Sequence, residues 1–536
     1  MIRPSQIRII ALHKSAAGLL LAVSMAVLSL AARPAAAADR VVKIDSGVIE
    51  GVPALTPGVT AYLGIPYAAP PVGELRWRPP QPADPWPNVR NADRYSPACM
   101  QYYMVPLSWA NFGDYEPKSE DCLYANVWTP AKSADEKLPV LVWIHGGGYF
   151  AGSATERLHH GDNLAAKGVI LVSFNYRLGA FGFMAHPDLT KESPNHASGN
   201  YGLMDQVAAL QWVHRNIAAF GGDPSRVTIF GESAGAGSVN CMQATPLTKG
   251  LFQGVIAESG SAFSRFGFGG GSSKSLAEAE REGVSFAQGM GANTIAEMRA
   301  IPAERILVAA KSVPFGVYAP ITDGYVLPED VYAIFSEGKQ NDVPVLVGSN
   351  SDEGTVLGAV QPRGLTPELQ REYDTLYPPE RTVNTTAGAA LWMMRTWARL
   401  EMKTGTHKAY EYYFSRAVPY PTDQKFASDV SHLGAHHGSE ISYVFNNLDV
   451  RKARNWPWTK EDYGLADMMS SYWVNFATKL DPNGPGLPVW PVYDDSHPQV
   501  MHFDTKVDVI PLPRVDEFDF WDNVQNEKSA PAGQSR

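Results

Sequence analysis

Continuous apolar stretches alternate with one long amphipathic stretch along the middle of this chain. Four of the apolar stretches contain β-branched residues and end at glycine or polar residues, as buried strands do. They are LPVLVWIHGG (138–147), GVILVSFNY (168–176), RVTIFG (226–231) and VPVLVGSN (343–350). Residues 201–220 instead place apolar side chains at helical spacing. The pattern therefore predicts an α/β fold, with a large, mostly parallel central sheet and helices on both faces.

One predicted strand runs directly into a serine that is flanked by glycines. VTIFGESAGAGS places Gly231, Ser233 and Gly235 after the strand at 226–231 and before a helix-permissive run. A G-x-S-x-G pattern between a strand and a helix forms a strained turn, which presents the serine hydroxyl at the top of the sheet. The same letters occur by chance in loops of long proteins, but this strand-turn-helix context favours Ser233 as a nucleophile.

A serine nucleophile needs a base, an acid that orients the base, and donors for the oxyanion. HGGGYF (145–150) follows a predicted strand, and its three glycines let backbone N–H groups approach a ligand closely. A plain turn is the alternative, whereas a phosphate loop is disfavoured because no Lys-Ser or Lys-Thr follows. After another buried strand, GSNSDEG (348–354) offers both Asp352 and Glu353 as the acid.

Three histidines follow the two acids in SHLGAHHGSEI (431–441): His432, His436 and His437. This gives the order serine, acid and base that the strand-turn-helix arrangement requires. Histidine shuttles protons, binds metals or lies at the surface, so its chemistry alone does not rank the three. No ligand set surrounds this group or the pair His159-His160, and the sequence therefore calls for no metal and no cofactor.

The N-terminus has the pattern of a secretory signal peptide over residues 1–38. Basic residues precede the apolar run AAGLLLAVSMAVLSLAA (16–32), and the small residues PAAAAD follow it. The run falls short of the ~20 residues of a spanning helix, which disfavours an uncleaved anchor. We expect a secreted or periplasmic protein that does not contact the membrane after cleavage. One domain should cover residues 39–525, followed by a flexible tail at 526–536.

The net charge excludes some classes of binding partner, and the cysteines are interpreted in the light of the expected export. A net charge of -10 argues against nucleic acid and anionic membranes as partners. Export would favour a disulfide among the three cysteines. Cys99 and Cys122 lie 23 residues apart in a loop-like stretch, so they are the candidate pair. Cys241 lies in an apolar stretch and is expected to be a buried free thiol.

Taken together, these segments resemble the type-B carboxylesterase/lipase family, which includes cholinesterases and liver carboxylesterases on the α/β-hydrolase fold. The match within FGGDPSRVTIFGESAG is long and highly specific, whereas little matches between about 265 and 310. The similar segments are GIPYAAPPVGELRWRPPQP (64–82), SEDCLYANVWTP (119–130), WIHGGGYFAGS (143–153), NYRLGAFGF (175–183), GNYGLMDQVAALQWVHRNIAAFGGDPSRVTIFGESAGAGS (199–238), GSNSDEG (348–354) and HGSEISYVF (437–445).

The resemblance implies a role for each matching position. It implies Ser233 as nucleophile, Glu353 rather than Asp352 as acid, and His437 as base, since His437 alone begins the His-Gly-x-Glu pattern. The remaining implied roles are oxyanion donation by the backbone N–H groups of Gly147, Gly148 and Ala234, a disulfide between Cys99 and Cys122, a buried ion pair between Arg76 and Glu120 beside it, and a buried supporting network that includes Glu232.

The implied base leaves two histidines without a catalytic role. We expect His436 to be a flanking loop residue and His432 to be a surface or loop residue. Replacing His437 by alanine should abolish turnover, whereas replacing either of the other two should largely spare it.

The substrate is a small-molecule ester whose acyl and alcohol groups the sequence does not define. The loop between the cysteines is rich in aromatic residues, including Tyr102 and Trp109, and in the family it borders the active-site gorge. Its rings either bind an apolar part of the substrate or pack the loop. Near the family's acyl pocket, Gly316 and Tyr318 are candidate lining residues, and Gly316 would leave room for a bulky acyl group.

Three functions compete. The sequence favours a serine carboxylesterase that works through an acyl-enzyme intermediate. The same triad could act instead on an amide, a lactone or a specialised ester such as a toxin or xenobiotic. A non-catalytic adhesion protein is disfavoured, because such relatives lack the serine and this chain has candidates for all three catalytic groups.

Overall fold

The computed structural model describes residues 40–102, 117–263, 274–314, 316–362, 364–421, 432–450 and 456–529. These residues belong to one folding unit that begins at Arg40. The predicted signal peptide and Trp109 lie outside the described residues. Among the helices of the described part, none is both long enough and apolar enough to cross a membrane.

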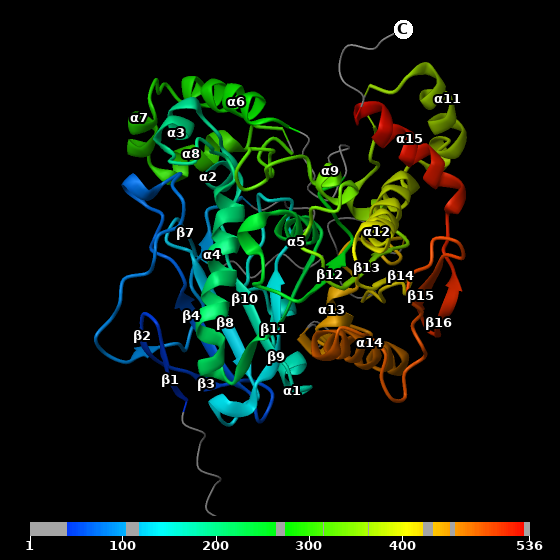
Figure 1. Ribbon diagram of the computed structural model, residues 1–536, viewed down its shortest axis with the longest axis horizontal. Coiled ribbons are helices and arrows are strands. Elements are labelled where there is room, and N and C mark those ends of the chain that lie inside the picture. The colour runs from blue at the N-terminus through cyan, green and yellow to red at the C-terminus, as the bar shows by residue number, and fades with distance from the viewer. Residues whose placement is uncertain are drawn as a thin grey trace, which may run out of the picture. The chain divides into compact units, whose positions relative to one another are not determined.

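An 11-stranded sheet forms the centre of this unit (Figure 1). In spatial order its strands are β16 (Val507–Pro511), β15 (Gln499–Phe503), β14 (Ala409–Phe414), β13 (Val345–Asn350), β12 (Gly254–Glu258), β11 (Gly222–Glu232), β9 (Leu138–Ile144), β10 (Ile170–Phe174), β8 (Tyr124–Thr129), β4 (Thr60–Pro66) and β3 (Val52–Pro53). The strands from β15 to β10 pair in parallel, and the pairs at both edges are antiparallel. The four predicted strands are β9, β10, β11 and β13, so the predicted parallel-rich sheet is confirmed.

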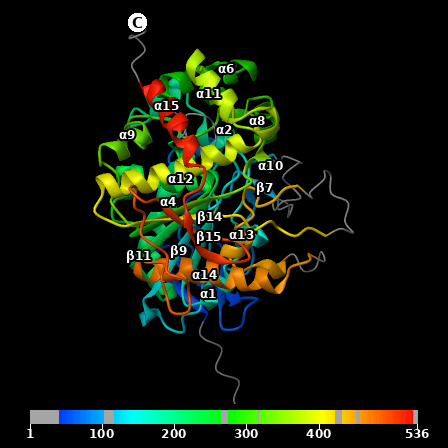
Figure 2. The same cartoon turned by 90° about the vertical axis from the view of Figure 1, so that its right-hand side faces the viewer.

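Side chains of the central strands alternate between two hydrophobic clusters, one on each face of the sheet. In β9, Val140 and Val142 belong to the first cluster, whereas Leu141 and Trp143 belong to the second. The first face is covered by α4 (Tyr201–Asn216), α5 (Ala234–Ala244) and α12 (Asn384–Thr404), and the second by α1 (Asp162–Ala166), α13 (Ile441–Val444) and α14 (Lys460–Lys479). Figure 2 shows α12 and α14 on opposite sides of β14 and β15. Helices on both faces explain why these strands lack a polar face.

Shorter elements complete the described part of the chain. β1 (Val41–Ile44), β2 (Gly47–Glu50) and β5 (Arg90–Asn91) form a small sheet, and β6 (Ala98–Cys99) pairs with β7 (Lys118–Ser119). The remaining α-helices are α2 (Gly179–Phe183), α3 (Pro187–Glu192), α6 (Leu276–Gly289), α7 (Ile295–Ala300), α8 (Ala303–Ala310), α9 (Val331–Ser336), α10 (Gly354–Leu357), α11 (Pro367–Leu376) and α15 (Phe518–Ser529). In both views, α2, α6 and α8 gather beyond the same end of the sheet (Figures 1 and 2).

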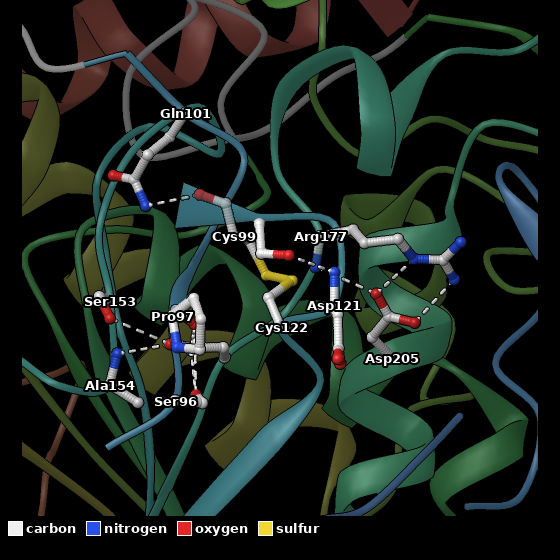
Figure 3. The surroundings of a disulfide bond; sticks show 12 residues. Ser96, Pro97, Cys99, Gln101, Asp121, Cys122, Ser153, Ala154, Arg177 and Asp205 are labelled. Atoms are coloured by element: carbon white, nitrogen blue, oxygen red, sulfur yellow. Dashed lines mark hydrogen bonds and ion pairs between the residues drawn. A yellow bond between two sulfur atoms is a disulfide. The ribbon is translucent and has the colours of Figure 1, made fainter. Parts of the chain in front are cut away.

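A disulfide joins Cys99 to Cys122 (Figure 3). Cys241 is a buried free thiol. Arg76 lies near this disulfide and donates two hydrogen bonds of 2.6 Å to Glu120. The Arg76 guanidinium also donates to the backbone carbonyl of Ile301 at 2.7 Å. The disulfide and the buried ion pair that the resemblance implies are therefore both present in the structure.

Helix α15 extends beyond the expected end of the domain. Its inward-facing Trp521 and Val524 are buried, and the helix continues through the polar residues 526–529, which we expected in the flexible tail. The Asn526 and Glu527 side chains are exposed on this helix, so the polar composition that suggested a tail is also compatible with a last helical turn.

A buried glutamate in α12 makes stability depend on pH. Glu401 is fully buried, accepts a 3.0 Å hydrogen bond from Gln243 and lies across Gly405 from Asp342. Burial, with Asp342 adding to it, raises the pKa of Glu401 to about 8. The native state therefore holds a proton that the unfolded state releases above its own pKa of about 4.3. Stability from this group is present at low pH and is lost as pH rises towards 8.

Glutamine at position 401 mimics the protonated glutamate and cannot ionise. We expect the free energy of unfolding of Glu401→Gln to gain about 1.4 kcal/mol per pH unit relative to the wild type between about pH 5 and 7.5. Urea unfolding at pH 5, 6, 7 and 8 measures this difference. The substitution Glu50→Gln, at an exposed position, makes the same charge change and is the control. The difference between its free energy of unfolding and that of the wild type should not vary with pH. A constant offset for Glu401→Gln would contradict the prediction.

Candidate active site

Ser233 occupies a sharp turn between β11 and α5. Its backbone has φ 58° and ψ −123°, a conformation that non-glycine residues adopt only under strain. The Ser233 N–H donates to the carbonyl of Glu258 at 2.8 Å, and its carbonyl accepts from Gly237 at 2.9 Å. A Cβ on Gly235 would lie 2.1 Å from the carbonyl oxygen of Ile144. Glycine at this position thus allows the backbone approach that holds the strained turn in place.

The glycine loop HGGGYF crosses beside this serine. A Cβ on Gly146 would lie 3.1 Å from the Cβ of Ser233, which shows how closely the two backbones approach. Gly147 and Gly148 have φ values of 104° and 62°. Within the described residues, the N–H groups of Gly147, Gly148 and Ala234 donate to no protein acceptor. The loop therefore offers backbone donors next to the serine.

Glu353, and not Asp352, contacts a histidine. The Oε2 of Glu353 lies 2.5 Å from Nδ1 of His437, and its Oε1 accepts the N–H of Asn350 at 2.8 Å. Asp352 instead accepts the N–H of Ala435 at 3.0 Å, which ties the two loops together. The histidine contact is thus made by the acid that the resemblance implied, and its catalytic role stays a prediction.

A second carboxylate faces the other nitrogen of the same ring. The Oε1 of Glu232 lies 3.1 Å from Nε2 of His437, and Glu232 is buried. Burial alone would lower the pKa of His437, but the carboxylates of Glu232 and Glu353 outweigh it and raise that pKa to about 9. Burial in turn raises the pKa of Glu232 to about 7, with Glu353 adding to the effect and His437 opposing it.

Two more buried carboxyl groups, which the sequence did not single out for catalysis, surround this site. Glu440 accepts a 2.5 Å hydrogen bond from Asn350, and Glu258 accepts one of 2.8 Å from Trp473. Burial raises the pKa of Glu440 to about 8 and that of Glu258 well above its ordinary value. Asn350 and Glu440 belong to motifs that carry the family resemblance, so these motifs could have identified both residues as part of the site. No motif marks Glu258, which ends a buried strand.

His436 is a flanking loop residue, as expected, but this part of the loop is packed inside the protein. Its side chain is 1% exposed, and both ring nitrogens have hydrogen-bond partners, Tyr420 and the backbone carbonyl of His437. The rings of His436 and His437 do contact different partners, but other parts of the protein enclose both rings. His432 is exposed, as expected.

The tentative substrate residues are distributed around the glycine loop and beyond it. Tyr102 stacks on Phe150 at a ring distance of 5.6 Å. Tyr318 packs edge-on against Phe286 at 5.9 Å, and burial raises its pKa, with Glu282 and Tyr102 contributing. Gly316 is exposed and has φ 83°, and no atom of the described residues lies within 4 Å of the position of a Cβ. Its part in an acyl pocket stays a prediction.

Comparisons with known proteins identify the family of this chain. The sequence model of the Carboxylesterase family matches residues 38–378 and 380–521. The fumonisin B1 esterase of Sphingopyxis macrogoltabida is 35% identical over 86% of this chain and 86% of its own length. The para-nitrobenzyl esterase of Bacillus subtilis (strain 168) is 33% identical over 84% of this chain and 92% of its own. Human cocaine esterase is 33% identical over 88% of each chain.

A solved structure of a PNB esterase superposes with a TM-score of 0.76 at 31% identity, covering 90% of this chain and 99% of its own. The two folds are therefore the same over most of their length, and the predicted α/β-hydrolase fold is confirmed. The extent of the family match and the identity to several esterases leave one conclusion: this chain belongs to the carboxylesterase family and is a carboxylic ester hydrolase.

Proposed function

We propose that this protein is a serine carboxylesterase in which Ser233, Glu353 and His437 form the catalytic triad. The observation that carries the proposal is the 2.5 Å contact between Glu353 and Nδ1 of His437, because an acid on Nδ1 orients the ring and its tautomer as a triad acid does. The strained backbone of Ser233 supports the same assignment. Gly147, Gly148 and Ala234 are the proposed oxyanion donors.

The mechanism follows from these positions. His437 accepts the Ser233 proton at Nε2 as the hydroxyl oxygen attacks the ester carbonyl, and the backbone N–H groups stabilise the oxyanion. The imidazolium then gives its proton to the alcohol as that group leaves, which produces an acyl-enzyme. Water hydrolyses the acyl-enzyme by the same two proton transfers, and the acid product and free serine result.

Glu232 affects the charge that His437 carries. If both Glu232 and Glu353 were ionised, two negative charges would surround the imidazole and hold it in its protonated form, which cannot act as a base. Burial disfavours the second charge and raises the pKa of Glu232 to about 7. Protonated Glu232 leaves Glu353 as the single contacting carboxylate, and a neutral His437 is then available as the base.

The compartment is part of the proposal. The N-terminal pattern over residues 1–38 is that of a cleaved signal peptide, which would leave a domain from residue 39 and a polar C-terminal tail. The disulfide supports export, since such bonds persist mainly in oxidising compartments. We therefore propose a secreted or periplasmic enzyme.

A specialised ester is a second candidate substrate. The relative with 35% identity is named for fumonisin B1, and another relative is named for cocaine. A panel of p-nitrophenyl esters of graded acyl length, together with these two compounds, a lactone and an amide, separates a general esterase from a specialised one. Selective turnover of one compound over simple esters would favour the second candidate.

A fluorophosphonate probe tests the nucleophile directly. We expect the purified protein to react with one equivalent of probe at Ser233, because the triad activates that hydroxyl, and to lose its esterase activity in step. Peptide mapping identifies the labelled serine. The exposed Ser225, which lies in the same strand β11, provides the internal control and should stay unlabelled. Labelling elsewhere, or activity that survives full labelling of Ser233, would refute the assignment.

A further inference from the structure

His436 is enclosed between the proposed base and an aromatic residue from another segment. Its Nδ1 lies 2.8 Å from the backbone carbonyl oxygen of His437, and its Nε2 lies 2.6 Å from the hydroxyl of Tyr420. The carbonyl of His436 itself accepts from Asn350 at 2.9 Å. Side chain and backbone of this residue are thus both bonded within the site.

The partners define the proton positions on the ring. A carbonyl oxygen only accepts, so Nδ1 of His436 must carry the hydrogen of that bond. In the neutral ring Nε2 is then an acceptor, and the Tyr420 hydroxyl must donate to it. The chain of bonds therefore runs in one direction, from the phenol through the imidazole to the backbone of His437. Each donor in this series of hydrogen bonds is matched by an acceptor.

We propose that His436 is a positioning residue for catalysis, which, together with Tyr420, sets the backbone of His437 and so the direction of the catalytic ring. The proposal rests on the proposed function, in which His437 is the base. The acid loop holds the residues that precede the base: Asp352 accepts from the N–H of Ala435, and Thr355 donates to the carbonyl of Leu433. Together with the bonds of His436, these contacts fix the segment that leads into His437.

The benefit of such an anchor lies in the geometry of proton transfer. His437 must keep Nδ1 on Glu353 while Nε2 points to the serine, and a misplacement of about 1 Å can cost on the order of 100-fold in rate. The ring of His437 is fixed at Nδ1 by Glu353, but the rotation of its backbone needs a separate constraint. The bond from His436 to the His437 carbonyl supplies that constraint at the residue concerned.

Three substitutions separate this role from simple packing. The sequence alone predicted that His436→Ala would largely spare turnover, but both of its bonds are lost in this variant, and we now expect kcat to fall about 10- to 100-fold with KM changed less than about threefold. In His436→Asn the side-chain amide lies where Nδ1 was and still donates to the His437 carbonyl, so kcat should recover to within about threefold of the wild type. Tyr420→Phe removes the phenol alone and should give an intermediate kcat.

The readouts are chosen to exclude a purely structural effect. Rates are expressed per active site, titrated with a fluorophosphonate, so that unfolded protein does not count. The exposed substitution His432→Ala in the same segment is the matched control, with wild-type kcat. If His436→Ala does not fold, His436→Asn and Tyr420→Phe still decide the question.

Two results would overturn the positioning role: kcat of His436→Ala within twofold of the wild type, or no recovery in His436→Asn. Failure of the proposed function looks different, since His437→Ala would then retain activity whatever position 436 contains.

Discussion

Replacing His437 by alanine should lower kcat by about four to six orders of magnitude, since loss of a triad base removes both proton transfers of the reaction. The residue lies against Glu353 at 2.5 Å on one ring nitrogen and against Glu232 at 3.1 Å on the other, and an alanine side chain makes neither contact. His436 is bonded through both ring nitrogens and faces Tyr420 instead. Hydrolysis of p-nitrophenyl butyrate measures the effect.

Ser233→Ala should cost as much as His437→Ala, and the double variant should be no slower than either, because the two residues act as one unit. Binding should be largely retained, so KM should change little where the rate remains measurable. His432→Ala serves as the control for substitution within the same loop. Independent, multiplying losses from Ser233→Ala and His437→Ala would contradict the shared mechanism.

The central sheet could be predicted from the sequence because strands that are buried on both faces appear as continuous apolar runs. β9, β10, β11 and β13 are continuous apolar runs, and α4 has apolar residues at helical spacing. The edge strands β15 and β16 were not predicted. Both are short and partly exposed, β15 pairs in parallel with β14 and antiparallel with β16, and mixed sequences such as QVMHF and VDVIP show no clear alternation of apolar residues.

The site was predictable in its parts but not in its contacts. Ser233 and the glycine loop have local signatures, because strained turns and close backbone approaches require glycine. Asp352 and Glu353 follow the same strand, so only the path of the turn decides which one reaches His437. The burial of His436 depends on Tyr420, 16 residues earlier in the chain, and no local pattern encodes that contact.

The candidate substrate residue Gly316 likewise cannot be interpreted from its local sequence. Gly316 has φ 83°, so the backbone conformation by itself can account for a glycine there. A positive φ and a need for space both lead to glycine in the sequence, and only the three-dimensional neighbours distinguish them.

The glycine loop allows this distinction to be tested at Gly147. Its φ is 104°, and a Cβ would lie 2.2 Å from the carbonyl oxygen of Ala151. Because backbone atoms form this contact, the loop must move to accept Gly147→Ala, and the proposed oxyanion donors at Gly147 and Gly148 move with it. We expect kcat to fall about 10²- to 10³-fold, the loss seen when one oxyanion donor is removed.

Gly168 supplies the matched control for that substitution. It is exposed, has φ 95° and has nothing within 4 Å of the position of a Cβ. Gly168→Ala therefore adds the strain of a positive φ, about 1 kcal/mol, without a steric clash and far from the serine. Thermal unfolding and kcat of the two variants separate strain from clash. Gly168→Ala should lower stability slightly with wild-type kcat, whereas Gly147→Ala should lower both. The clash with Ala151 forces the backbone of Gly147 to move in Gly147→Ala. If kcat were nevertheless equal in the two variants, the Gly147 backbone would not be an oxyanion donor.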